Sequence, residues 1–212
     1  MDKVVEVKIC GLTNRDDALV ALEAGADYLG FVLYQASPRH VSSQGLGKII
    51  GGLPPCRAIA VCVNMPRADV EMLVADYGLY GAQVHGNESA MDYADFPVPL
   101  WRAVKRVKEA WQPAPEAWRA KRWVVDAVVP GEYGGTGVAA DWAAAAALAA
   151  QRPVMLAGGL TPENVAAAIR AVKPCGVDVS SGVESTPGHK DAERVRAFIR
   201  NVKGIDSTPV QE

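Results

Sequence analysis

Short apolar runs alternate with amphipathic stretches from one end of this chain to the other, and this alternation limits the fold more than any other feature. The apolar runs predict strands at 4–10, 28–33, 57–63, 80–84, 100–104, 122–126, 154–157 and 176–179. The stretches between them predict helices at 14–23, 43–51, 66–77, 89–94, 142–150, 162–172 and 191–202. Strands that alternate with helices favour a parallel sheet with its helices packed outside.

Eight predicted strands within 212 residues fit a small (β/α)8 barrel, a fold that typically has about 250 residues. An open, doubly wound sheet is the alternative. Half of the residues are hydrophobic, which is enough for one substantial core. We therefore expect a single domain at 1–203, followed by a polar end at 204–212 without regular structure.

Two predicted strands near the end of the chain run directly into turns of small residues. Val154–Ala157 is followed by Gly158 and Gly159, and Gly176–Val179 is followed by Ser180, Ser181 and Gly182. Such turns leave backbone N–H groups open to one point, as in phosphate sites. In (β/α)8 barrels, the loops after the last two strands often bind phosphate. We expect a phosphorylated small molecule as the ligand.

A long connection, 127–140, follows the strand that ends at Asp126. It contains Gly134, Gly135 and Gly137 within four residues, and glycine loses the most backbone freedom on ordering. Long loops of this kind at the carboxyl end of a strand are more often ligand loops or lids than plain connectors.

Composition excludes several classes of function. The net charge of −2 gives no basic surface for nucleic acid, and no apolar run reaches the ~20 residues that span a bilayer. The four cysteines match no zinc spacing, and the three histidines are not spaced for a shared metal. No dinucleotide glycine motif opens the first helix, and no targeting peptide is visible. We expect a cytoplasmic protein without metal or cofactor.

Candidate catalytic side chains lie where the predicted strands end. They are Cys10, Arg39 after the second strand, Gln83, His85 and Asp126. Four of them also have plainer interpretations, in chain order: a small core thiol for Cys10, a solvated loop charge for Arg39, a turn residue for His85 and a helix cap for Asp126. Cys10 is followed by a glycine at a strand end, and the residues after Asp126 are too rich in glycine to begin a helix. These two residues are the candidate base and acid.

A charged residue, Lys8, lies within the first predicted strand. Alternation along the strand places Glu6, Lys8 and Cys10 on one face. Closing a barrel brings the last strand beside the first, and a buried charge needs a partner. We expect Lys8 to pair with Asp178, with Glu6 or Glu184 as a further partner.

Taken together in order and spacing, the motifs resemble one family, phosphoribosylanthranilate isomerase of tryptophan biosynthesis. The resemblance covers nearly all of residues 5–203. It rests on these stretches: Lys8–Thr13, Ser37–Arg39, Val63–Asn64, Gln83–Gly86, Asp126, Gly134–Gly137, Asp141–Trp142, Leu156–Leu160 and Asp178–Glu184.

The resemblance implies a (β/α)8 barrel that carries out an Amadori rearrangement without cofactor or metal. Asp126 matches the general acid that protonates the ribose ring oxygen, and Cys10 matches the general base that removes the C2′ proton. Arg39 matches the residue that faces the anthranilate carboxylate. The matches to the phosphate loops are Gly158, Gly159, Ser181 and Gly182, and the other candidate substrate-binding residues are Gln83, His85 and Ser180. Those roles need Cys10 as thiolate and Asp126 as neutral acid, so we expect a lowered pKa for Cys10 and a raised pKa for Asp126.

Two other functions stay open at this point. One is a different phosphosugar enzyme on the same barrel, such as the related histidine-pathway isomerase or the indole-forming synthase. The histidine enzyme uses paired aspartates, whereas the first strand here ends in Cys10. The other is a barrel that binds a phosphorylated ligand without catalysis. The chain is expected to be a monomer or a homodimer.

Overall fold

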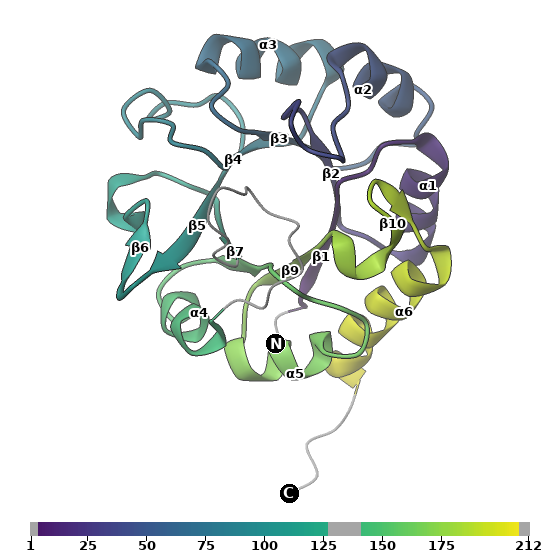
Figure 1. Ribbon diagram of the computed structural model, residues 1–212, viewed down its shortest axis with the longest axis vertical. Helices are drawn as coiled ribbons and strands as arrows, with labels where there is room; N and C mark the ends of the chain where they lie inside the picture. Colours follow the sequence, from purple (N-terminus) through teal and green to yellow (C-terminus); the bar gives the residue numbers. More distant parts are fainter. Residues whose placement is uncertain (1–3, 127–140, 208–212) are drawn as a thin grey trace, which may run out of the picture.

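A closed ring of parallel strands forms the centre of the molecule in the computed structural model, which describes residues 4–126 and 141–207 (Figure 1). The strands of the ring are β1 (Glu6–Cys10), β2 (Tyr28–Val32), β3 (Ala58–Cys62), β4 (Gly81–Val84), β5 (Leu100–Val107), β7 (Arg122–Asp126), β8 (Val154–Leu156) and β9 (Gly176–Val179). Each strand pairs in parallel with its neighbours, and β1 pairs with β9 to close the ring. The predicted (β/α)8 barrel is confirmed, and the open sheet is wrong.

Helices cover the outside of the ring (Figure 1). They are α1 (Arg15–Ala24), α2 (Ser43–Ile50), α3 (Arg67–Tyr77), α4 (Trp142–Ala149), α5 (Val165–Val172) and α6 (Ala192–Lys203). Side-chain caps explain several starts, because Asn14, Ser42, Asp141 and Asp191 each accept a bond from a first-turn amide.

The helix expected at 89–94 is wrong. Those residues form turns, and the Arg67 guanidinium binds the Asp92 and Asp95 carbonyl oxygens at 2.7 and 3.1 Å. The fifth helix begins at Val165 rather than at 162. Asn164 is its N-cap residue, and the Asn164 side chain instead bonds backward to Thr161 N and Gly159 O.

Two hairpins extend the barrel beyond the expected elements. Strand β5 continues to Val107 and turns back into the antiparallel strand β6 (Ala110–Gln112), after which a 3-10 turn, η1 (Pro115–Ala117), leads to β7. After β9, the 3-10 turn η2 (Ser181–Val183) leads into a hairpin of β10 (Glu184–Thr186) and β11 (His189–Lys190).

The barrel has two hydrophobic regions. The larger lies between the strands and the helices and includes Ile9, Phe31 and Phe198. The smaller fills the interior of the ring and includes Tyr28, Ile59, Trp101, Val124 and Met155. The interior is therefore packed and is not a channel, and in this fold the ligand site is expected above the carboxyl ends of the strands.

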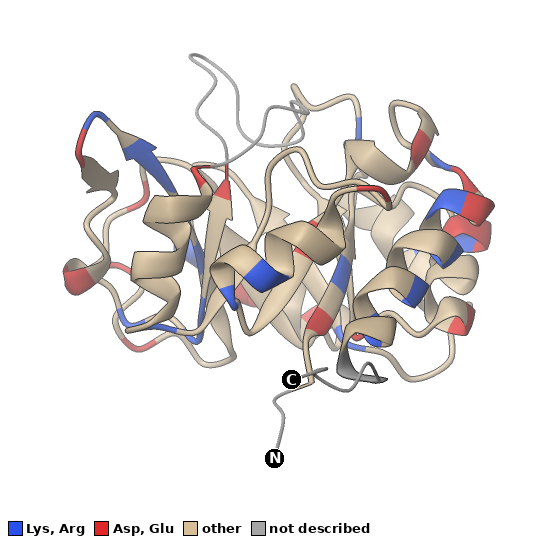
Figure 2. Ribbon diagram, turned by 90° about the horizontal axis from the view of Figure 1, so that it is seen from below, with Lys and Arg blue, Asp and Glu red and all other residues tan. Residues whose placement is uncertain are grey.

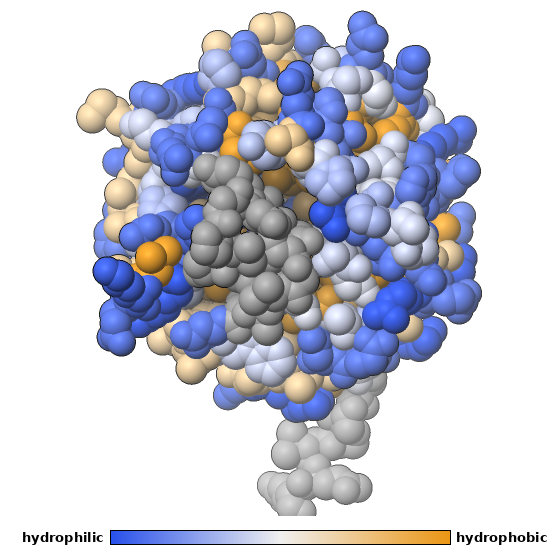
Figure 3. Space-filling view, viewed as in Figure 1, coloured by the Kyte–Doolittle hydropathy of each residue, from blue (hydrophilic) through white to orange (hydrophobic). Residues whose placement is uncertain are grey.

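Charges of both signs are interspersed over several of the outer helices, whereas α4 carries none (Figure 2). Hydrophobic residues on the face seen in Figure 3 are scattered among hydrophilic ones. No helix in the described parts of the chain combines the length and hydrophobicity needed to cross a membrane. At the polar end, Gly204–Ser207 form the 3-10 turn η3, while 208–212 and the glycine-rich connection 127–140 lie outside the described residues.

Candidate active site

One pocket at the carboxyl end of the barrel brings together every candidate site residue found from the sequence. Its lining includes Cys10, Arg39, Gln83, His85, Asp126, Gly158, Gly159, Ser180, Ser181 and Gly182. Cys10 ends β1, Asp126 ends β7, and Gln83 lies within β4, so their inward positions follow from strand alternation. The pocket therefore combines a thiol, a carboxyl group, an imidazole and a guanidinium under loops of small residues.

The glycine loop after β8 leaves backbone amides open. Gly158 and Gly159 have φ values of 77° and 63°, which favour glycine. Among the described residues, neither amide has a hydrogen-bond acceptor. This loop also touches the loop after β9, because a Cβ atom at Gly182 would collide with the Leu160 carbonyl oxygen. The two loops together form one edge of the pocket, suited to a phosphate group.

Arg39 lies in the loop between β2 and α2 and is 8% exposed. Its Nε and Nη2 atoms donate to the two carboxylate oxygens of Glu184, at 2.8 and 2.7 Å. The side-chain stem of Arg39 passes over Gly11, whose φ is 73°. A Cβ atom there would lie 2.5 Å from Arg39 Cδ. This bidentate pair fixes the plane of the guanidinium and leaves three of its five N–H bonds unused by Glu184.

Lys190 of β11 binds the same carboxylate and shares the Oε1 atom with Arg39 Nε. Its Nζ atom lies 2.7 Å from Glu184 Oε1 and 3.3 Å from the Ser180 carbonyl oxygen. The side chains of Glu184 and Lys190 are 5% and 1% exposed, and neither lines the pocket. Burial lowers the pKa of Lys190, whereas Glu184 opposes this change. Sequence reasoning missed this cluster, since it placed Glu184 beside Lys8.

Lys8 is fully buried inside the barrel, directly below Cys10 in β1. Its Nζ atom lies 2.8 Å from Asp178 Oδ2 and 3.0 Å from Gln83 Oε1. The expected pair with Asp178 is confirmed, and the two residues are register partners in β1 and β9. Glu6 and Glu184 do not join it. Glu6 instead binds Arg122 and the Tyr28 hydroxyl at the opposite end of the barrel.

The Cys10 thiol lies close to Lys8. A Cβ atom at Gly30 would lie 2.8 Å from Cys10 Sγ and 2.9 Å from Lys8 Cε, so Gly30 provides the space that both side chains occupy. Burial raises the pKa of Cys10, and the Lys8 cation only partly opposes this effect. The lowered pKa expected from the sequence is wrong, because loss of hydration destabilises the thiolate more than one nearby cation stabilises it.

Asp126 is 8% exposed, and its Oδ2 atom lies 3.6 Å from His85 Nε2. That separation is too long for a hydrogen bond. Burial lowers the pKa of His85 to about 3, with further contributions from Arg102, Lys8 and Lys105. His85 is therefore neutral at pH 7 and places no positive charge beside the Asp126 carboxyl group.

Other lining residues were not singled out as site residues from the sequence. They are Val32, Tyr34, Ser37, Val61, Val63, Val124, Ala157, Leu160 and Val179, together with Asp178, which was expected only as the partner of Lys8. Several lie at or just beyond strand ends, where alternation could have found them. They add an apolar wall to the polar groups. No three His, Cys, Asp or Glu side chains within 4–126 and 141–207 are grouped to hold a metal ion.

Comparison with known proteins agrees with this geometry. The sequence model of the family described as PRAI, N-(5'phosphoribosyl)anthranilate (PRA) isomerase, matches residues 7–201. N-(5'-phosphoribosyl)anthranilate isomerase of Geobacter sulfurreducens is 47% identical over 203 residues, which cover 95% of this chain and 100% of that protein.

Solved structures give the same result. Phosphoribosyl anthranilate isomerase from Thermotoga maritima matches with a TM-score of 0.84 at 35% identity, covering 94% of this chain and 99% of that one. A structure of such an isomerase in complex with reduced 1-(o-carboxyphenylamino)-1-deoxyribulose 5-phosphate has a TM-score of 0.81 at 34% identity, with the same coverage of both chains. This chain belongs to the N-(5'-phosphoribosyl)anthranilate isomerase family.

Proposed function

We propose that Cys10 and Asp126 are the base and acid with which this isomerase converts N-(5-phosphoribosyl)anthranilate into 1-(2-carboxyphenylamino)-1-deoxyribulose 5-phosphate, a step of tryptophan biosynthesis. The observation that carries the proposal is the meeting of both residues in one pocket with an arginine and two glycine-containing loops. A substrate that carries both a carboxylate and a phosphate fits a pocket that is lined by an arginine and by loops with open backbone amides.

Asp126 begins the reaction as a neutral acid. It donates its proton to the ribose ring oxygen, the bond from that oxygen to C1′ breaks, and C1′ becomes part of a protonated Schiff base with the anthranilate nitrogen. Asp126 is left as a carboxylate. The raised pKa that this step needs for Asp126 stays a prediction from the sequence.

Cys10 then acts as the base. Its thiolate removes the proton from C2′, and the electron pair of that bond moves toward the Schiff-base nitrogen to give an enolamine. The enolamine gains a proton at C1′ while its C2′ hydroxyl loses one, which yields the aminoketose. Lys8, below the thiol, supplies the positive charge that the thiolate needs in a buried place.

The remaining candidate residues bind the ends of the substrate. Arg39 is assigned to the anthranilate carboxylate, because a planar guanidinium can donate two parallel hydrogen bonds to it. The amides of Gly158, Gly159, Ser181 and Gly182 are assigned to the phosphate, and Ser180 lies beside them. Gln83 and His85 also line the pocket. As uncharged polar groups, they can hydrogen-bond to the substrate during ring opening without adding a charge to the pocket.

The test separates chemistry from binding. Cys10→Ala and Asp126→Asn are each expected to lower kcat by at least about 10²–10⁴-fold. Both variants should keep the affinity of the reduced product analogue within a few fold, measured by titration calorimetry. If either variant retains nearly full turnover of the anthranilate substrate in a fluorescence assay, its assigned role is wrong. Loss of both turnover and analogue binding would instead show that the substitution disrupts the pocket.

We also propose a cytoplasmic location and an assembly no larger than a homodimer. A solved relative from Thermotoga maritima is described as dimeric, with variants made monomeric. Light scattering coupled to size exclusion would give the mass directly, and fractionation of cells would give the location. A secreted protein, or a stable trimer or larger assembly, would contradict these proposals.

A further inference from the structure

The cluster behind Arg39 has a charge arrangement that the pocket lining alone does not explain. Arg39 and Glu184 by themselves would form a neutral pair, and a neutral pair attracts an anionic ligand poorly. Lys190 brings a second cation to the same carboxylate, at 2.7 Å from Glu184 Oε1. The three buried side chains therefore carry a net charge of one positive unit. Arg39 is the member of the three that lines the pocket.

We propose that Lys190 determines specificity for the substrate carboxylate. Its positive charge offsets the negative charge of Glu184, so that the positive charge of Arg39 is not cancelled and can attract the carboxylate. The inference rests on the role of Arg39 proposed above and extends it to a residue that does not touch the substrate. Lys190 is a positioning residue, which acts through Glu184. Its bond to the Ser180 carbonyl oxygen also joins this cluster to the loop assigned to the phosphate.

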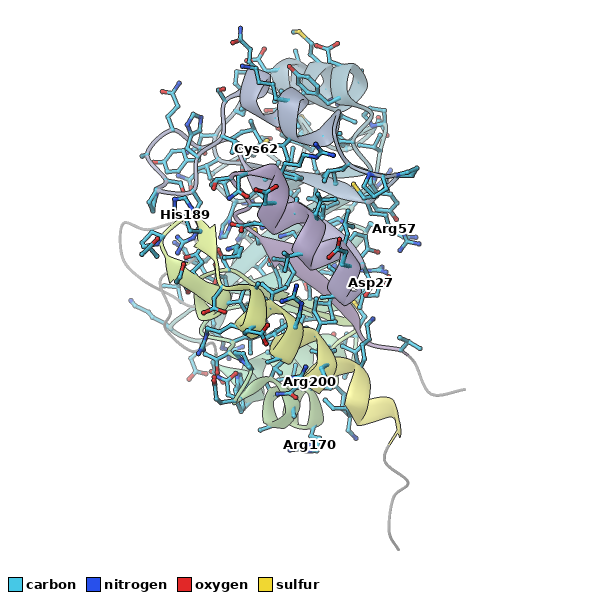
Figure 4. All side chains as sticks on the ribbon, turned by 90° about the vertical axis from the view of Figure 1, so that its right-hand side faces the viewer. Asp27, Arg57, Cys62, Arg170, His189 and Arg200 are labelled. Carbon is cyan, nitrogen blue, oxygen red and sulfur yellow. The ribbon has the colours of Figure 1, made fainter. Side chains whose placement is uncertain are left out.

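A second lysine elsewhere in the chain offers a control for the loss of a lysine ion pair, in a more exposed place: its side chain is 34% exposed, against 1% for Lys190. Lys203 Nζ lies 2.8 Å from Asp27 Oδ2 and 3.3 Å from the Val5 carbonyl oxygen, so it also joins a carboxylate to a backbone carbonyl. Figure 4 shows Asp27 far from His189, the neighbour of Lys190 in β11, along the length of the barrel. Replacing Lys203 by Met therefore removes a similar ion pair without touching the pocket.

The experiment measures Kd for two ligands by titration calorimetry: the reduced product analogue and the same molecule without its carboxylate. Lys190→Met should raise the Kd of the analogue about tenfold or more, because the cluster becomes neutral. The Kd of the ligand without a carboxylate should change by no more than about twofold. With substrate, KM should rise while kcat stays nearly constant. The control Lys203→Met should leave the Kd of both ligands unchanged.

The double variant Glu184→Gln/Lys190→Met tests the charge argument directly. It restores one net positive charge around Arg39, so it should recover most of the affinity for the carboxylate ligand that Lys190→Met loses. If Lys190→Met alone fails to fold, the double variant decides the matter by itself. Retained preference for the carboxylate supports the proposal, and a tenfold loss of that preference overturns it.

Other outcomes point elsewhere. Equal weakening of both ligands by Lys190→Met would overturn the proposal, because it would indicate only a structural tie between Lys190 and the Ser180 loop. The variant Arg39→Met distinguishes the proposed role of Arg39 from the proposed role of Lys190. If it keeps the carboxylate preference, the proposed role of Arg39 is wrong. If it loses the preference while Lys190→Met does not, only the role of Lys190 is wrong.

Discussion

At the scale of single residues, the site depends on charges placed beneath or behind the groups that face the substrate. Lys8 lies below Cys10, and Glu184 lies behind Arg39. In both places a buried ion pair fixes an orientation, and its removal would leave one charge without a partner. The groups proposed to act on the substrate are thus held by Lys8 and Glu184, which do not line the pocket.

Cys10 should titrate above an ordinary thiol, because burial raises its pKa and Lys8 only partly opposes this. Alkylation by iodoacetamide, followed against pH, should therefore have its midpoint above that of a model thiol. Lys8→Met should raise the midpoint further, since it removes the nearest cation. The variant Cys10→Ala gives the background rate of the other cysteines. A midpoint at or below that of the model thiol would contradict the conclusion that burial affects the pKa of Cys10 more than the Lys8 cation does.

At the scale of elements, the two loops proposed to bind the phosphate pack against each other as one unit. The loop after β8 and the loop after β9 come so close that no side chain fits between Gly182 and Leu160. Behind them, Arg194 of α6 donates to the Gly182 carbonyl oxygen at 3.0 Å. A change in one loop should therefore alter the other.

Gly182→Ala should reduce both stability and anion binding. The added methyl group meets the Leu160 backbone, which can move only with its loop, and overpacking of this kind typically costs about 1–3 kcal/mol. Inhibition by inorganic phosphate should weaken, and the midpoint of urea unfolding should fall. Gly204→Ala is the control, because nothing lies within 4 Å of its Cβ position. If phosphate inhibits the Gly182 variant as strongly as the unmodified protein, the loop that contains Gly182 does not bind the anion.

The sequence predicted the strands of the barrel well, because each is a short apolar run between polar turns. It did not predict the hairpin of β10 and β11, since Glu184–Lys190 reads as a polar turn after the phosphate loop. The partner of Glu184 was misassigned for a related reason. Strand alternation places Lys8 and Asp178, but it cannot place a side chain that follows a 3-10 turn.

At the scale of the whole molecule, the interior of the barrel carries a buried charge pair where a purely apolar core would be more stable. Lys8 and Asp178 link the first and last strands of the ring, the two strands most distant in sequence. The pair therefore stands at the closure of the barrel, directly beneath the pocket.

Lys8→Met should destabilise the fold by about 3–5 kcal/mol, because it leaves the Asp178 carboxylate buried without its cation. The double variant Lys8→Met/Asp178→Leu should lose less than Lys8→Met alone, since it buries no charge. Urea unfolding measures both. If the double variant loses as much as Lys8→Met alone or more, the buried charge of Asp178 is not the cause of the loss.

Neutral His85 should make the stability of the whole barrel depend on pH. Its pKa is about 3 in the folded protein against an ordinary value of 6.5, so between these values the unfolded chain binds a proton that the folded protein does not. The free energy of unfolding should therefore fall as the pH decreases below about 6.5. Above that pH, His85 is neutral in both the folded and the unfolded chain, so it causes no further change in stability. The fall in unfolding free energy between pH 7 and pH 5 should be smaller in His85→Gln than in the unmodified protein. His189→Gln, at an exposed position of the β11 hairpin, should leave the fall unchanged. An equal fall in His85→Gln would show that other groups cause it and that His85 gains its proton as readily in the folded protein as in the unfolded chain.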